Sequence, residues 1–85
     1  MYSRKQILDL AFEDAVERCR KIDAMQGMGM QDIQVLDEQT MADFMRAYAE
    51  REGFYFTEAE IHSTIVADVE TLNKRGEVLK LTTNT

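Results

Sequence analysis

The sequence predicts an all-α fold, a small bundle of three main helices in a single domain that spans residues 1–85. Three observations favour this fold. Apolar residues recur at three- and four-residue steps in three separate stretches, which is the spacing of one face of a helix. Capping boxes mark two helix starts, and glycines follow the ends of the stretches. The chain contains no proline, so no residue forces a break inside a helix.

The first helix is expected from about residue 4 to residue 25. Ser3 and Gln6 have the spacing of a capping box, in which each side chain accepts a hydrogen bond from the backbone amide of the other residue. Gly27 and Gly29 are expected to end the helix, since glycine adopts the left-handed cap conformation without strain. One face of this helix carries the apolar residues Leu8, Ala11, Phe12, Ala15, Val16, Cys19 and Ile22.

The second helix is expected from about residue 38 to residue 52, after a connection over residues 26–36. Asp37 is a suitable N-cap, because its carboxylate can accept a backbone hydrogen bond from the first turn, and Gly53 follows the end of the helix. The apolar stripe of this helix consists of Met41, Phe44, Met45 and Tyr48. The apolar residues of the connection that we expect to fold back onto the core are Ile33, Val35 and Leu36.

The third helix is expected from about residue 58 to residue 75. Thr57 and Glu60 form a capping box, and Phe56 and Ile61 occupy the two positions of a hydrophobic staple, which fixes the angle at which the chain enters the helix. The apolar stripe that follows consists of Ile61, Ile65, Val69 and Leu72, and Gly76 comes after the last turn. The remaining residues form an extended C-terminal tail, which either docks on the bundle or is recognised by another molecule.

The composition excludes several classes of protein. The longest apolar run has three residues, whereas a membrane-spanning helix needs about 20. The first residues lack the apolar stretch of a signal peptide, and a single cysteine cannot form a disulfide within the chain. We therefore expect a cytoplasmic protein with no membrane contact.

The negative charge lies in one part of the sequence. The formal net charge is −6, and residues 30–60 hold eight acidic side chains against two arginines, whereas acids and bases balance on either side of this segment. A segment of this sign repels nucleic-acid phosphate and attracts a basic protein surface. The sequence therefore favours a basic protein partner and argues against direct nucleic-acid binding.

No residue pattern indicates a catalytic, cofactor or metal site. His62 is the only histidine, and Glu58, one turn before it, could pair with it on the helix surface. A metal site needs three or four ligands, and no second histidine or cysteine has a suitable spacing, so we expect His62 to be a solvated surface residue rather than a ligand. Cys19 lies on an apolar stripe, where a buried and unreactive thiol is typical. We expect no enzyme, because no acid, base or nucleophile has a partner at a suitable spacing.

The candidates for a contact surface lie in and near the acidic segment. Phe54, Tyr55 and Phe56 are consecutive aromatic residues, and because Phe56 belongs to the staple, Phe54 or Tyr55 should be exposed. Methionines adapt well to irregular binding surfaces, and an exposed aromatic side chain next to acidic groups is typical of protein contacts. The residues predicted to contact a partner are Asp43, Glu50, Glu52, Phe54, Tyr55, Met28 and Met30.

Residues 43–61 contain a more specific pattern, a helix ending in Ala-x-x-x-Gly-Phe and then Phe-Thr-x-x-Glu-Ile. This pattern resembles the nif-eleven-like family of nitrogen-fixation-associated proteins and peptide leaders. The residues that carry the resemblance are Ala49, Gly53, Phe54, Phe56, Thr57, Glu60 and Ile61. The resemblance implies a small helical domain of a kind that often serves as a leader and docks onto an enzyme that modifies a downstream peptide.

The sequence thus predicts a non-catalytic protein-binding module, an acidic adaptor, inhibitor or regulatory subunit that contacts a basic partner. Two alternatives remain open. The chain could be an inhibitor that imitates nucleic acid and blocks a DNA-binding enzyme, for which a regular double row of carboxylates would be needed. It could also be a self-associating structural protein that forms a homodimer through its apolar residues.

Overall fold

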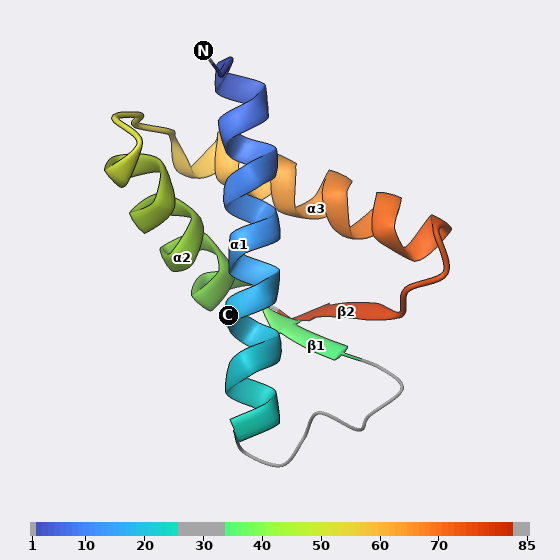
Figure 1. Cartoon of the computed structure of the whole chain (residues 1–85). Coiled ribbons are helices and arrows are strands. Elements are labelled where there is room, and N and C mark those ends of the chain that lie inside the picture. Colours follow the sequence, from blue (N-terminus) through green and yellow to red (C-terminus); the bar gives the residue numbers. More distant parts are fainter. Residues whose placement is uncertain (1, 26–33, 83–85) are drawn as a thin grey trace.

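The computed structural model describes residues 2–25 and 34–82. The chain forms three helices and two short strands, in the order α1 (Arg4–Met25), β1 (Gln34–Asp37), α2 (Glu38–Arg51), α3 (Glu58–Lys74) and β2 (Leu79–Thr82). Helix α1 lies across both α2 and α3, and the two strands lie side by side behind its second half (Figure 1). The three predicted helices are confirmed, each with ends within one residue of those expected from the sequence.

Each helix begins at the cap that the sequence predicts. The amide of Ser3 donates to Gln6 Oε1 at 2.7 Å, and the amide of Gln6 donates to Ser3 Oγ at 3.2 Å. The Asp37 carboxylate accepts a hydrogen bond of 3.0 Å from the amide of the third residue of α2. Thr57 and Glu60 form the complete capping box, with both reciprocal hydrogen bonds at 3.1 Å. These bonds satisfy amides that a helix start otherwise leaves without a partner.

The prediction of a purely helical fold is wrong in one respect, because the two strands form a small parallel sheet. Gln34 lies opposite Leu79, and the register continues to Asp37 opposite Thr82. The expected extended tail thus becomes β2 and docks beside the connection that precedes α2. Sequence periodicity could not reveal this pairing, since the two strands have four residues each and are far apart in the chain.

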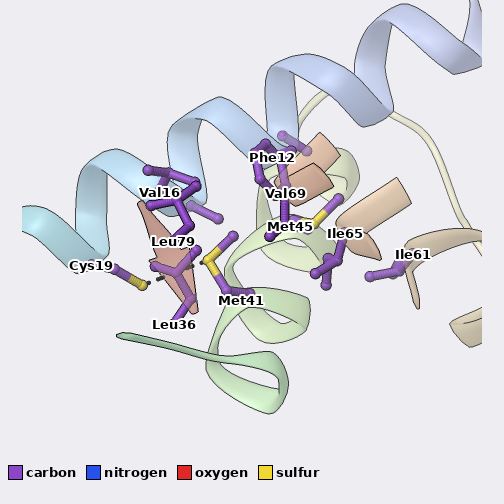
Figure 2. Close-up of a cluster of buried hydrophobic side chains, with 12 residues drawn as sticks. Phe12, Val16, Cys19, Leu36, Met41, Met45, Ile61, Ile65, Val69 and Leu79 are labelled. Atoms are coloured by element: carbon purple, nitrogen blue, oxygen red, sulfur yellow. Dashed lines mark hydrogen bonds between the residues drawn. The ribbon is translucent and has the colours of Figure 1, made fainter. Parts of the chain in front are cut away.

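The hydrophobic core lies where α1 crosses α2, α3 and the sheet (Figure 2). Seven of its large side chains are almost completely buried: Ile7, Phe12, Leu36, Met41, Met45, Ile61 and Ile65. The expected position of Ile22 on the core face is wrong, since the residue is 40% exposed. Ile22 lies in the last turn of α1, beyond Cys19, the last buried residue of this helix.

The connection before α2 only partly follows its predicted role. Leu36 is completely buried, as expected, but Val35 is 48% exposed because neighbouring side chains of a strand point to opposite faces. Ile33 lies outside the described residues, and so do Gly27 and Gly29, the predicted end of the first helix.

Candidate interaction surface

The junction between α2 and α3 presents three consecutive aromatic residues from a closely bonded turn. Gly53 adopts a φ of +83°, in the left-handed region, and the amide of Phe54 donates to the carbonyl of Ala49 at 2.8 Å. The rings of Phe54 and Phe56 stack with their centroids 5.9 Å apart, and both are half-buried. Tyr55 lies between them in sequence and is 79% exposed. The expectation that one aromatic side chain at the junction is exposed is confirmed.

Arg4 ties this junction to the start of α1. Its guanidinium donates to the carbonyl oxygen of Tyr55 at 3.2 Å and to the Glu60 carboxylate at 2.9 Å. It also lies over the ring of Phe56, 4.6 Å from the centroid. The hydrogen bond from Arg4, followed by the one from the Thr57 backbone, lowers the pKa of Glu60. The backbone that presents Tyr55 is therefore held by contacts from another helix.

The structure separates the predicted acidic residues into two groups. Among the described residues, no ion pair engages Glu50 or Glu52, which lie just before the aromatic residues. Asp43 lies two turns earlier on α2, where it accepts a hydrogen bond from Gln39 at 3.0 Å and pairs with Arg46 at 3.4 Å. Its charge is therefore partly compensated. We call Glu50, Glu52, Phe54 and Tyr55 the junction surface.

Arg51 and Tyr48, which the sequence did not predict as contact residues, border this surface. The guanidinium of Arg51 lies 5.6 Å from the centroid of the Tyr48 ring and 3.9 Å from the carboxylate of Asp14. Partial burial, and then the charges of Glu52 and Asp14, raise the pKa of the Tyr48 phenol. Arginine and aromatic side chains, both of which are enriched in protein interfaces, thus adjoin the acidic residues here.

A cleft of about 250 Å³ separates α2 from α3. It is lined by Glu38, Gln39, Ala42, Arg46, Glu58, Ile61, His62 and Ile65. His62 pairs through Nδ1 with the Glu38 carboxylate on α2, and not with Glu58, which instead lies 3.9 Å from Arg46. Sequence analysis missed the His62–Glu38 pair because only the fold brings these two residues together. His62 itself is exposed, as expected.

The remaining candidates for chemistry are Cys19 and groups of potential metal ligands. Cys19 is buried, and burial, followed by the charges of Asp23 and Asp37, raises the pKa of its thiol. Its sulfur lies 3.7 Å from the sulfur of Met41 within the core (Figure 2), so the expected buried cysteine is confirmed. In the part of the chain that the structure describes, no three histidine, cysteine, aspartate or glutamate side chains gather as metal ligands would.

Two of the predicted contact residues, Met28 and Met30, lie outside the described residues.

Within residues 2–25 and 34–82, no helix has the length and apolar character to cross a bilayer. Arg4 was missed as a site residue because its partners lie more than 50 positions away, and no local signal marks such a contact.

No family model, curated protein or solved structure matches the chain. The resemblance of residues 43–61 to the nif-eleven-like family therefore stays a prediction.

Proposed function

We propose that this chain is a non-catalytic protein-binding module, an adaptor, inhibitor or regulatory subunit whose junction surface contacts a basic protein. The observation that carries the proposal is the position of Tyr55, which is 79% exposed although Arg4 anchors its backbone at 3.2 Å. An aromatic side chain on a fixed support loses little conformational entropy on binding and buries a large apolar area. Such residues dominate the affinity of many interfaces.

The acidic residues support a basic partner. Since the carboxylates of Glu50 and Glu52 have no ion-pair partner among the described residues, their field acts on an approaching molecule. Charges at the edge of an interface chiefly raise the association rate, and they do so less at high salt. The resemblance of residues 43–61 to a family with docking leaders supports the same class of function.

The two other hypotheses have less support. In a nucleic-acid mimic, carboxylates would form regular rows, but Arg46 on α2 contacts both Asp43 and Glu58 and interrupts the acidic side of this helix. For a homodimer, the exposed apolar side chains Val35, Val66 and Val78 are available, but they are all smaller than the tyrosine that the junction surface presents. Sedimentation equilibrium over a range of concentrations tests the dimer, which a monomer at the highest concentration would exclude.

Photo-cross-linking in the native host tests the proposed surface. A photoreactive phenylalanine analogue replaces Tyr55 in one variant and Lys21, an exposed residue of α1, in a second variant. We expect adducts with a basic protein from position 55 only, and a lower yield when Glu50→Lys and Glu52→Lys are added. Glu70→Lys, in the last part of α3 and away from the junction, is the charge control. Equal adducts from both positions would contradict the proposal.

A further inference from the structure

Strand β2 lies between β1 and α3, and one of its two edges faces away from β1. The amide of Gln34 donates to the carbonyl of Val78 at 3.0 Å, and Gln34 lies opposite Leu79 in the register. Since the backbone groups of successive strand residues point to opposite edges, Lys80 pairs with β1, whereas Leu79 and Leu81 direct their amides and carbonyls away from it. An edge of this kind is a template for pairing with another chain.

Asn73, in the last turn of α3, occupies this edge at Leu79. Its Oδ1 accepts a hydrogen bond of 2.8 Å from the Leu79 amide, and its Nδ2 donates to the Leu79 carbonyl at 3.1 Å. Both bonds are partly buried. A neighbouring strand makes the same two bonds to one residue of an antiparallel pair. The side-chain amide of Asn73 therefore takes the place of a third strand.

A groove of about 470 Å³ lies beside Leu81, the other outward-facing residue of β2. Its lining residues are Val66, Val69, Glu70, Asn73, Lys74 and Leu81. Val66 is 44% exposed, so the groove reaches the surface and an approaching chain has room beside the edge. An added strand would bond to both Leu79 and Leu81, and Asn73 already holds the first of them.

The outer edge of β1 is limited in a different way. β1 ends at Asp37, and α2 begins at Glu38, directly after it. Val35 is therefore the one residue of β1 that can offer both its amide and its carbonyl to a further strand, because Asp37 already caps α2. Each edge of the sheet thus offers one residue, which is too short for a ladder.

We propose that Asn73 is an edge guard, a side chain that closes the β2 edge against pairing with a second copy of this chain. Without this side chain, the Leu79 amide and carbonyl would lack partners in a partly buried place, which is unfavourable. The same edge of a second copy supplies the matching acceptor and donor, so antiparallel pairing of two β2 edges restores both bonds. The guard is separate from the junction surface, because Asn73 and Tyr55 lie at opposite ends of α3.

Sedimentation velocity of the whole chain over a range of concentrations tests the guard. We expect Asn73→Ala to self-associate at least about tenfold more tightly than the wild type, since two hydrogen bonds then form between copies. Amide hydrogen exchange locates the contact. The Leu79 amide should be protected in the wild type, lose protection in the dilute Asn73→Ala monomer, and regain it in the associated form.

A second substitution tests whether the β2 edge carries the association. Leu81→Pro removes an amide that faces away from β1, so the pairing of β1 with β2 is kept. In the Asn73→Ala background it should return self-association to the wild-type level. Thr71→Ala removes a side-chain hydrogen bond of 3.0 Å to a carbonyl of the same helix, and this matched control should stay as monomeric as the wild type.

Two further variants separate edge pairing from a loss of stability. Gly53→Ala strains the backbone far from the sheet, so it should lower stability without causing association. Asn73→Asp decides the question if Asn73→Ala does not fold. Its carboxylate accepts from the Leu79 amide but cannot donate to the carbonyl, so it should self-associate more than the wild type in high salt, which screens the added charge.

Four results would overturn the proposal. One is a folded Asn73→Ala or Asn73→Asp chain that is as monomeric as the wild type. Another is self-association that persists when Leu81→Pro is added. The third is equal association in Gly53→Ala. The fourth is a Leu79 amide that exchanges in the wild type as fast as a fully exposed amide, and this measurement does not depend on the folding of any variant.

Discussion

Arg4 donates a hydrogen bond to the carbonyl oxygen of Tyr55 across 51 positions of the chain, and this contact joins the first turn of α1 to the α2–α3 junction. The same guanidinium binds Glu60, the residue that completes the cap of α3. A single side chain thus holds the exposed tyrosine, the helix cap and the ring of Phe56 together. Because these contacts converge, the backbone of the junction is held by α1 as well as by its own helix caps.

Replacing Arg4 with glutamine should loosen the junction and lower the stability of the domain at neutral pH. Since Arg4 lowers the pKa of Glu60, this contribution is present above the ordinary carboxyl pKa of 4.5 and is lost as the pH falls through the lowered value. Urea midpoints of Arg4→Gln and the wild type should therefore converge in acid. Lys21→Gln, which removes an exposed charge elsewhere on α1, is the control and should leave the midpoint nearly unchanged. A constant difference down to the lowest pH would speak against the Arg4–Glu60 pair.

Gly53→Ala should destabilise the domain by about 1 kcal/mol. The cost is conformational, because Gly53 has a φ of +83° and a Cβ added there would meet no atom within 4 Å. Gly53→Asn should recover part of the loss, since asparagine tolerates the left-handed region better than alanine does. Chemical denaturation measures both variants, and equal stability of alanine and asparagine at this position would show that backbone strain is not the cause.

The helices and their caps could be predicted from the sequence because their signals are local. Asp37, Thr57 and Glu60 each act within one helical turn, and their spacing alone indicates the hydrogen bonds that form. The same local reasoning predicted that Phe54 or Tyr55 is exposed, since Phe56 belongs to the staple, and the structure shows that the exposed residue is Tyr55. These parts of the fold and of the candidate surface depend on neighbours in the sequence.

The sheet and the Arg4 contacts depend on residues that are distant in the chain, and the sequence alone did not reveal them. Asn73 illustrates the reason: its side chain accepts from the amide of Leu79 at 2.8 Å and donates to the Leu79 carbonyl at 3.1 Å. This bridge secures the start of β2, yet an asparagine near a helix end has many other roles.

Met41→Ala should destabilise the domain by about 2–5 kcal/mol, a large part of the stability of so small a chain. The Met41 side chain is completely buried between α1 and the sheet, and its sulfur touches that of Cys19 at 3.7 Å (Figure 2). Met41→Leu keeps most of the volume and should cost less than about 1.5 kcal/mol. Thermal unfolding followed by circular dichroism compares the two variants. Similar losses in both would mean that the site responds to shape or sulfur contact rather than to a cavity.

Asp68→Asn should stabilise the domain by about 1 kcal/mol at about pH 7.5, a value discounted for a half-buried group that solvent screens. The folded pKa of Asp68 is about 6 against an ordinary value of 3.8, so the folded state binds the proton more tightly. Its stabilising effect is complete below the ordinary value and is lost as the pH rises through about 6. Urea denaturation should therefore show the variant gaining over the wild type as the pH rises. A gain that is equal at about pH 4 and about pH 7.5 would contradict this sign.

Once a partner has been captured, Tyr55→Ala and the charge reversals Glu50→Lys and Glu52→Lys should weaken binding in different ways. Tyr55 is 79% exposed in the free chain, so its removal should leave stability almost unchanged but raise the dissociation rate, by roughly tenfold or more if Tyr55 anchors the interface. The charge reversals should mainly slow association, and this effect should shrink as salt is added. Stopped-flow kinetics at several salt concentrations, with Glu70→Lys as the charge control, separates the two effects. If Tyr55→Ala bound with unchanged rates, the tyrosine would lie outside the interface. A slower association of the charge-reversal variants would then not be enough to identify the junction surface as the binding site.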